Sequence, residues 1–420
     1  MRISQQRHCL ALWLLFSPIG VLQAQSPMGL SAAMQRAREV SPVRRAALAE
    51  VTAARAAERQ AGAMPNPALS GDLERTTRDD DRSVVTTVRL AQPLDIWGAR
   101  SARRETAALR RQATEAALAA VEADLDVEVV HAWTGTVAAA QRAALAGRVL
   151  AAFDTAIRIS AERLGAGDVS GYSHRRLQLE AARYAGWQTE ARLQADAARR
   201  ALAVLVDSAP SPSFRLPDSL QVAPLALDTA RFASAAGRPA VQAAAFTAAG
   251  AEQAATAVTK ERIPIPTVVG GYKAEQMPGD PDTWTGFVAG LSFPLPLWDR
   301  RGAARDAAVA TGEASRWQAA ATQRGAERDL AVALDEVRAV EAQSEQLGRR
   351  LGGEARRAIE ALQVSWEEGE ISLLEWLDGV RAWHEAFDAY VALQAERIVR
   401  RANLARAAGR PVAELLTEVP

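Results

Sequence analysis

The chain has 420 residues with 50 basic and 50 acidic side chains, and only 5% of its residues are aromatic. This formal neutrality excludes an ordinary nucleic-acid-binding domain, which would carry a basic excess. After residue 24 no apolar stretch approaches the roughly 18 to 20 residues that a membrane-spanning helix needs. The mature chain is therefore predicted to be soluble or to cross a membrane as a β-barrel, which also satisfies every backbone polar group in lipid.

The first residues have the features of a secretory signal. Two arginines precede an apolar run from Cys9 to Phe16, and Leu22-Gln23-Ala24 provides the residues that a signal peptidase recognises. We predict a signal peptide over residues 1–24, with an amphipathic N-terminal helix as the alternative. Cys9 is the only cysteine, so the mature chain has no disulfide and no cysteine-based metal site. Because Cys9 stands at the start of the apolar run and not after it, it cannot be the acylated first residue of a lipoprotein.

The mature chain consists of two tandem copies. Four short motifs recur in the same order at a nearly constant offset of about 200 residues. They are Ser41-Pro42-Val43 with Arg238-Pro239-Ala240, Pro65-Asn66-Pro67 with Pro264-Ile265-Pro266, Gln92-Pro93-Leu94-Asp95-Ile96-Trp97 with Phe293-Pro294-Leu295-Pro296-Leu297-Trp298, and Gly167-Asp168-Val169-Ser170 with Gly369-Glu370-Ile371-Ser372. Four ordered matches make chance pairing a poor explanation.

Both copies show the same predicted order of elements. The first copy covers residues 25–206 and contains a helix at about 30–62, a β-hairpin at 68–94, a long helix at 101–164, a tip at 165–171 and a helix at 172–206. A linker follows at 207–226. The second copy covers 227–409 and contains a helix at about 228–261, a β-hairpin at 267–293, a long helix at 302–368, a tip at 369–372 and a helix at 373–408, before a C-terminal tail at 410–420.

The predicted lengths and apolar spacing indicate helices packed side by side. The first long helix would span ~96 Å, and its two flanking helices, at about 50 Å each, would match it end to end. Apolar residues recur every three or four positions, as in neighbouring parallel helices: Leu118, Val121, Leu125, Val129, Trp133 and Val137, then Leu145, Val149, Phe153 and Ile157. A soluble coiled-coil rod would show the same stripe.

The hairpins argue against a soluble rod. Val84, Thr86, Val88 and Leu90 share one strand face, and Phe287, Ala289, Leu291 and Phe293 occupy the equivalent face in the second copy. Strands of this length match the roughly 9–11 residues of a tilted membrane strand. Four strands cannot close a barrel, so several chains must share one. Trp97 and Trp298, where strand gives way to helix, are predicted membrane-interface anchors; ordinary corner packing is the alternative.

These features together resemble the TolC-like outer-membrane efflux family over essentially the whole mature chain. Within it, Met64-Pro65-Asn66-Pro67, Gln92-Pro93-Leu94, Pro294-Leu295-Pro296-Leu297 and Gly369-Glu370-Ile371-Ser372 look most like the cobalt-zinc-cadmium resistance branch. The resemblance implies a mainly α fold with a small membrane β-barrel portion: long coiled-coil helical hairpins form an α-barrel tunnel, and each chain gives four strands to a shared trimeric barrel. It implies no enzymatic activity.

The resemblance also implies a role. The chain would be the outer-membrane channel component of a tripartite efflux system in a Gram-negative bacterium, extending into the periplasm. This passive duct would export metal cations or small toxic compounds. Its partners would be two further copies in a homotrimer, a periplasmic adaptor protein, an inner-membrane resistance-nodulation-division pump and outer-membrane lipid, with no nucleic acid. Some members of the branch are lipoproteins, whereas this chain would be anchored by its barrel alone.

The two tips are the predicted functional region, because in the family such tips form the periplasmic aperture and contact the adaptor. The candidate contact residues are Gly165, Gly167, Asp168, Val169, Ser170, Gly369, Glu370, Ile371 and Ser372. Gly165, Gly167 and Gly369 would permit the reversed backbone. The candidate aperture charges are Glu367, Glu368, Glu375, Asp378 and Arg381, which in a trimer would form rings or interchain pairs, also with Arg175 or Arg176. A solvated helix end is the alternative.

The sequence offers no catalytic set and predicts no cofactor or metal site. His131, His174 and His384 are far apart, each on a predicted helix, and there is no phosphate loop or nucleophile elbow. Two other functions stay open. A periplasmic adaptor also carries long helical hairpins, but it would need strand-rich domains split around one hairpin. An envelope scaffold without a pore would keep its hairpins in water.

Overall fold

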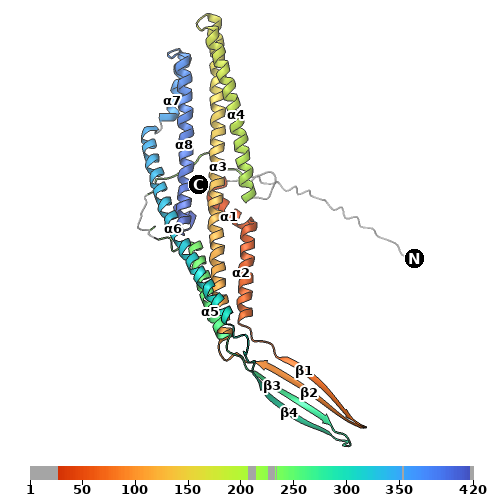
Figure 1. Cartoon of the computed structure of the whole chain (residues 1–420). Helices are drawn as coiled ribbons and strands as arrows, with labels where there is room; N and C mark the ends of the chain where they lie inside the picture. Colours follow the sequence, from red (N-terminus) through yellow and green to blue (C-terminus); the bar gives the residue numbers. More distant parts are fainter. Residues whose placement is uncertain (1–26, 207–213, 226–231, 233, 352–353, 417–420) are drawn as a thin grey trace, which may run out of the picture.

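The computed structural model describes residues 27–416 except 207–213, 226–231, 233 and 352–353. The signal peptide expected over 1–24 lies outside the described residues, as do residues 207–213 and 226 of the linker expected over 207–226. The described helices are arranged lengthwise, and a small sheet lies at one end of them (Figure 1).

The longest element is α3 (Ala99–Ala166), whose 68 residues span ~100 Å. Two shorter helices lie along it: α2 (Pro42–Ala61) packs beside the half nearer the sheet, and α4 (Gly171–Val206) beside the other half (Figure 1). A further short helix, α1 (Leu30–Val40), also packs on α3. One long helix beside two shorter ones is the arrangement that the predicted lengths require.

The second copy supplies α5 (Pro239–Lys260), α6 (Gly302–Leu351), α7 (Glu354–Glu368), α8 (Leu373–Ala407) and the short α9 (Val412–Leu415). The alanine-rich α5 packs against both α3 and α6. A methyl group added at Gly250 of α5 would lie 3.5 Å from Cβ of Leu109, so small side chains let α5 approach α3 closely. Helices α2, α3, α5 and α6 thus form one layer above the sheet.

Two predicted helices differ from the structure. The helix expected over 30–62 is two helices, because Pro42 has no backbone N–H to donate and Ser41 instead caps α2, its hydroxyl accepting from the Arg44 N–H at 3.2 Å. The helix expected from residue 228 begins at Pro239, in the favoured first position. The helix expected over 302–368 is described as α6 and α7; residues 352–353 between them lie outside the described residues, so its continuity stays a prediction.

The four strands form one antiparallel sheet in the order β1 (Ala68–Arg78), β2 (Asp81–Pro93), β3 (Thr267–Gln276) and β4 (Thr283–Ser292). Each copy supplies one hairpin, and the pairing of β2 with β3 joins them, with Val88 opposite Tyr272. The strand order β1-β2-β3-β4 matches the order α2-α3-α5-α6 of the helices attached to these strands. The two copies are therefore joined both in the sheet, by β2 and β3, and in the helical layer, by α3 and α5.

The core is a series of apolar clusters along the rod. Near the middle, Trp133 is fully buried with Leu30 and Ile398, and its indole N–H donates to the Met28 carbonyl at 3.0 Å. Towards the tips, Phe153 and Trp376 centre a second cluster. The predicted stripe along α3 is therefore the buried face of that helix from Leu125 onwards. Across the described residues, no helix combines the length and apolar character that crossing a membrane requires.

Candidate functional site

One face of the sheet is apolar and exposed. The strand register places Val88, Tyr272 and Phe287 in one row across three strands, and Leu90 lies on the same face of β2. Phe287 is 93% exposed and packs edge-on against Tyr272 with ring centroids 6.0 Å apart. The two hairpins therefore put their apolar residues on a common face, as the alternation in the sequence predicted. The same face also carries Leu69, Leu73, Val268 and Leu291, all exposed.

The opposite face of the sheet is polar. Asp72, Thr87 and Lys273 form one row across β1, β2 and β3. Arg89 forms an ion pair with Asp72 on this face, and Lys273 contacts Glu275 at 2.7 Å. The sheet is thus apolar on one side and charged on the other. Within the described residues, the outer edges of β1 and β4 pair with no other strand, so the sheet is open on both sides.

The two tryptophans beside the sheet have different surroundings. Trp97 follows β2, and its indole N–H donates to the Pro264 carbonyl at 3.0 Å, which ties the end of one hairpin to the start of the other. Trp298 follows β4 and is 92% exposed. Trp97 thus makes a corner contact and is still 45% exposed. That the two tryptophans anchor at a membrane interface stays a prediction.

At the first tip, the chain reverses at Gly167 and not at Gly165. Gly165 lies within α3, while Gly167 has φ 86° and closes the helix, and the Asp168 N–H donates to the Arg163 carbonyl at 2.9 Å. Ser170 begins the next helix, its hydroxyl accepting from the Ser173 N–H at 3.1 Å. The candidate contact residues of this tip are exposed except Val169, which is half-buried. The expectation that Gly165 supplies reversed backbone is wrong, because it remains helical.

The second tip has the same construction with a stronger cap. Gly369 has φ 80°, and the Glu370 N–H donates to the Ser365 carbonyl at 2.9 Å. Ser372 and Glu375 form a capping box at the start of α8: each side chain accepts from the backbone N–H of the other, at 3.3 and 2.7 Å. Ile371 packs against the Phe153–Trp376 cluster below. Both tips are therefore fixed turns between helices.

Most of the candidate aperture charges have local partners. Glu375 is engaged in the capping box, and the hydrogen bond from the Ser372 N–H lowers its pKa. Asp378 and Arg381 are 3.9 Å apart on the same helix, and Glu367 accepts from Gln363 at 2.9 Å. Glu368 is exposed. In the described chain Arg175 and Arg176 make no ion pair with these carboxylates. Pairing of these arginines with the aperture carboxylates of a neighbouring copy stays a prediction.

A residue that the sequence reasoning missed joins the two tips. The Arg163 guanidinium, in the last turn of α3, donates to the carbonyls of Trp366 at 3.2 Å and Glu367 at 2.9 Å. It also lies over the Trp366 ring, 5.4 Å from the centroid. The sequence did contain a signal for this role, because Arg163 is a basic residue in the last turn before a glycine, and such residues often bind helix-end carbonyls. The signal does not say which helix Arg163 would cap.

An aromatic group surrounds one of the predicted lone histidines. His384 on α8 lies 4.1 Å from Trp187 on α4 between ring centroids, with Tyr184 beside it at 6.0 Å. Burial lowers the pKa of His384, against the attraction of Asp388. His174 lies elsewhere, 3.2 Å from the Ser160 hydroxyl. Among the described residues, no three His, Cys, Asp or Glu side chains gather as a metal site would need.

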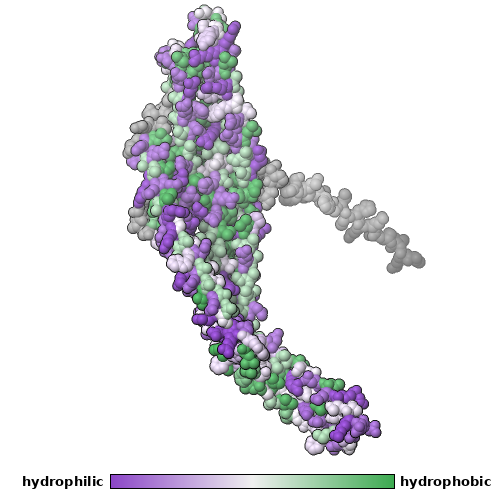
Figure 2. Space-filling view, viewed as in Figure 1, coloured by the Kyte–Doolittle hydropathy of each residue, from purple (hydrophilic) through white to green (hydrophobic). Residues whose placement is uncertain are grey.

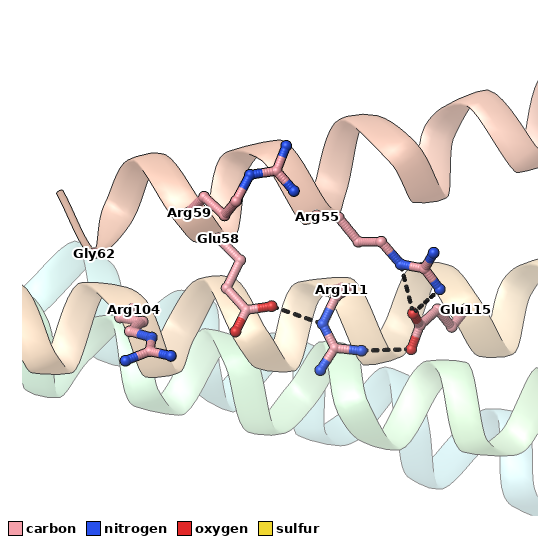
Figure 3. A pocket seen from close by; sticks show the side chains of 7 residues that line it. All are labelled: Arg55, Glu58, Arg59, Gly62, Arg104, Arg111 and Glu115. Atoms are coloured by element: carbon pink, nitrogen blue, oxygen red, sulfur yellow. Dashed lines mark hydrogen bonds and ion pairs between the residues drawn. The ribbon is translucent and has the colours of Figure 1, made fainter.

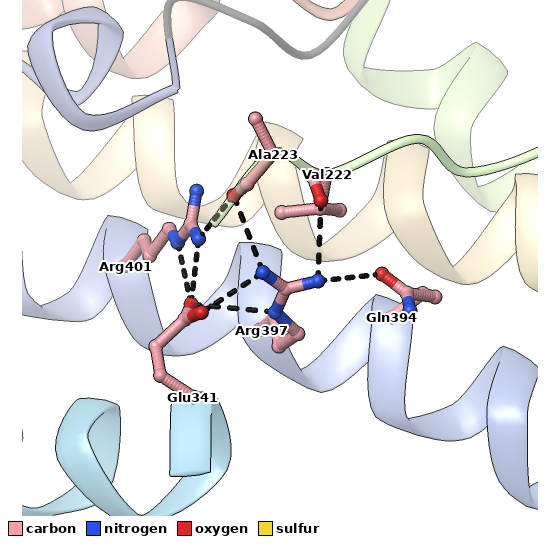
Figure 4. A network of polar contacts seen from close by, with 6 residues as sticks. All are labelled: Val222, Ala223, Glu341, Gln394, Arg397 and Arg401. Atoms are coloured by element: carbon pink, nitrogen blue, oxygen red, sulfur yellow. Dashed lines mark hydrogen bonds and ion pairs between the residues drawn. The ribbon is translucent and has the colours of Figure 1, made fainter. Parts of the chain in front are cut away.

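A buried ionic network holds the middle of the rod (Figure 4). Glu341 of α6 accepts from Arg397 at 2.8 Å and Arg401 at 2.6 Å, both on α8 and both 5% exposed at their side chains. The two arginines also donate to the carbonyls of Val222 and Ala223 at 3.2 and 2.6 Å. The network thus attaches the segment between the copies to both helices. Sequence reasoning missed it, because charges this far apart in the chain show no spacing pattern.

An open groove of about 600 Å³ lies between α2 and α3, on the half of the rod nearer the sheet (Figure 3). Arg111 bridges Glu58 at 2.7 Å and Glu115 at 2.6 Å, and Arg55 contacts Glu115 at 2.9 Å. The Arg111–Glu58 and Arg55–Glu115 pairs cross from one helix to the other, whereas Arg111–Glu115 lies within α3. Arg59 and Arg104 line the end near Gly62. The groove is therefore mainly a helix-to-helix contact.

Known proteins share this arrangement. The cobalt-zinc-cadmium resistance protein CzcC of Cupriavidus metallidurans is 24% identical over 395 residues, covering 94% of this chain and 93% of that protein. The fold matches CusC with a TM-score of 0.73 at 18% identity, over 92% of this chain and 93% of CusC. It also matches VceC of Vibrio cholerae with a TM-score of 0.72 at 17% identity, over 91% and 96%.

The sequence profile of one family covers most of the chain. It is described as outer membrane efflux protein and matches residues 33–208 and 219–410, so that each matched segment contains one hairpin and one tip. The match includes the exposed apolar sheet, the long helices and both turns described above. The chain therefore belongs to the outer membrane efflux protein family, whose members are outer-membrane transport proteins and not enzymes.

Proposed function

We propose that this chain is the channel subunit of a tripartite efflux system, a passive duct through the outer membrane and periplasm. The observation that carries the proposal is the sheet, which has an exposed apolar face, a charged opposite face and two open edges. An apolar outer face and a wet inner face are what a membrane β-barrel needs, and a closed barrel has no open edges.

The strand number supports a shared barrel. One chain contributes four strands, fewer than the roughly eight of the smallest membrane barrels. Closure then requires more than one chain, and three copies would give a twelve-stranded wall with each β4 edge paired to the next β1. The layer of α2, α3, α5 and α6 would continue from the end of each set of strands as a helical wall, ~100 Å long as set by α3.

The tips supply the far end of this duct. Gly167 and Gly369 make tight turns at the end opposite the sheet, where a periplasmic adaptor and an inner-membrane pump would dock. Exposed Asp168 and Glu368 are the charges most available for rings in a trimer. The adaptor alternative is less well supported, because the matching family is one of outer membrane efflux proteins and the chain has two β-hairpins, one in each copy.

Metal cations are the proposed cargo. The support is the similarity to CzcC, a cobalt-zinc-cadmium resistance protein, over nearly the whole length of both chains. Selection among cations would then be made by the pump, with the duct providing a charged path. Small toxic organic compounds are the competing cargo.

Two measurements test the proposal. The full chain, expressed in a Gram-negative host, should leave outer membranes only with detergent and run on gels as an oligomer that heating converts to monomer. A detergent-free monomer would refute the channel. For the cargo, a strain lacking the gene should become sensitive to zinc, cobalt or cadmium, and sensitivity to organic dyes alone would reassign it.

A further inference from the structure

The corner where the helices meet the sheet carries basic side chains that the duct itself does not need. Lys260 ends α5, Arg262 lies between α5 and β3, and Arg300 lies between β4 and α6. We name these three residues the basic corner. Arg262 Nε donates to the Arg300 carbonyl at 3.0 Å, which holds the two connections together. Lys260 Nζ would lie 3.6 Å from a methyl group at Gly98, so it reaches the turn before α3.

The acidic residues around this corner are already engaged. Glu261 is shared by Arg103 at 3.0 Å and Arg301 at 2.6 Å. Asp95 and Asp299 accept hydrogen bonds from backbone N–H groups of the turns that follow them. No carboxylate in the described part of the chain forms an ion pair with the basic corner. Its three positive charges are therefore available to an external anion.

Exposed apolar residues lie directly beside these charges. Trp298, Leu297 and Ile263 are each a few residues from the basic corner and are 92%, 61% and 44% exposed. Figure 2 shows the result: a hydrophilic band covers the end of the helical body, and hydrophobic surface begins where the sheet starts. A surface that changes from charged to apolar within a few residues matches the boundary between lipid headgroups and acyl chains.

The two ends of the sheet differ in charge. The hairpin turns at the far end carry five aspartates, Asp79, Asp80, Asp81, Asp280 and Asp282, beside Arg78 and Arg82. The basic corner lies at the end where the sheet joins the helices. An anionic membrane surface would attract only the end that carries the basic corner, so the charge distribution favours one leaflet.

We propose that Lys260, Arg262 and Arg300 bind the phosphate groups of anionic phospholipids in the leaflet that faces the helical body. This inference rests on the proposed function, because it requires the sheet to lie in a membrane. Guanidinium groups suit phosphate, which they bind through two parallel N–H donors. Each basic side chain near an anionic surface contributes about fivefold to the attraction, and a trimer would present three such corners.

The test is a lipid-binding measurement on the purified full chain. The protein in detergent is mixed with equal amounts of phosphatidylglycerol and phosphatidylcholine, and the bound lipids are counted by native mass spectrometry. The wild type should favour phosphatidylglycerol, and the variant Lys260→Gln/Arg262→Gln/Arg300→Gln should lose that preference by at least about tenfold. The matched control is Arg45→Gln/Arg192→Gln/Arg200→Gln, three exposed arginines on α2 and α4, which should keep it.

Further readouts separate the alternatives. Millimolar inorganic phosphate should leave phosphatidylglycerol binding unchanged; competition by it would mean a site for free phosphate and overturn the lipid assignment. Loss of the heat-sensitive oligomer in the triple variant would show a contact between copies, which also overturns the inference. The charge-retaining variant Arg262→Lys/Arg300→Lys should keep most of the preference, which guards against misfolding.

Failure of the inference is distinguishable from failure of the channel. Reconstitution into neutral phosphatidylcholine vesicles followed by alkaline extraction reports whether the sheet is embedded. If wild type and variant both stay in the vesicles yet neither favours phosphatidylglycerol, only the inference about the basic corner is lost. If neither chain stays in the vesicles, the proposed function is lost as well.

Discussion

Arg163 at the end of α3 donates to the backbone carbonyl of Glu367 at the end of α7, with 2.9 Å between nitrogen and oxygen. An arginine of the first copy therefore hydrogen-bonds the backbone carbonyls at the end of the corresponding helix in the second copy. Its position over the Trp366 ring adds a cation–π contact. This single side chain connects the two tips, and the tips are the proposed aperture of the duct.

Removing this connection should loosen the second tip. Arg163→Met keeps the apolar stem but loses the hydrogen bonds to α7, at a cost of about 1 kcal/mol. Amide hydrogen exchange in the last turn of α7 should then become faster, while exchange near Trp133 stays unchanged. Arg158→Met is the control, because Arg158 is exposed and its ion pair is with the exposed Glu162 on its own helix. Equal exchange in both variants would show that Arg163 does not hold the tip.

The two glycines of the first tip should respond differently to alanine. Gly167→Ala forces a side chain into φ 86° and should cost about 1 kcal/mol of unfolding free energy. Gly165→Ala lies within α3 and should be neutral or slightly stabilising, because alanine favours helix. Neither added methyl meets another atom within 4 Å, so the comparison isolates backbone conformation. Thermal melting in detergent measures it, and equal melting temperatures would contradict the turn geometry.

The buried ionic network should be sensitive to loss of Glu341. Glu341→Ala removes the carboxylate that the buried Arg397 and Arg401 share, which costs about 3–5 kcal/mol. Glu336→Ala on the same helix removes a half-exposed partner of Arg400 and should cost under about 1 kcal/mol. Urea denaturation followed by circular dichroism gives both values. A small effect at Glu341 would mean that solvent reaches the network.

Neighbouring residues on β4 test which face of the sheet meets lipid. Phe287→Arg places a charge on the apolar face, at a cost of about 2–4 kcal/mol near the middle of a bilayer, and should prevent stable insertion. Val288→Arg lies on the opposite face and should be tolerated. The measurement is the heat-sensitive oligomer recovered from outer membranes. Insertion of the Phe287 variant with failure of the Val288 variant would reverse the assignment of the faces.

Acid should weaken the start of α8 through Glu375. Its pKa is lowered in the folded chain by the hydrogen bond from the Ser372 N–H, so the folded state favours the charged form. The stabilisation is then fully present above the unfolded pKa and disappears as pH falls through the lowered value. Glu375→Gln should melt below the wild type at neutral pH, and the two should converge in acid. A constant difference at every pH would exclude this carboxylate as the cause.

Local chemistry was enough to predict much of this protein. The hairpins at 68–94 and 267–293 match the strands to within a residue or two, because alternating residues between proline-rich boundaries define strands locally. The shared apolar face followed as well, since strand faces alternate with a period of two residues. The helix break at Ser41 was missed, although Pro42 and the capping serine were visible, because the alanine-rich residues around them also favour helix.

The amino-acid sequence by itself determined the duplicated order of elements, the positions of the strands and the apolar stripe of the long helix. Each follows from periodicity over a few residues. Only the tertiary structure decided that Arg163 caps α7, that Glu341 holds Arg397 and Arg401, and that Lys260, Arg262 and Arg300 meet at one corner. Those contacts join residues up to about 200 positions apart, and the spacing of charges along a chain does not record which distant helices will pack together.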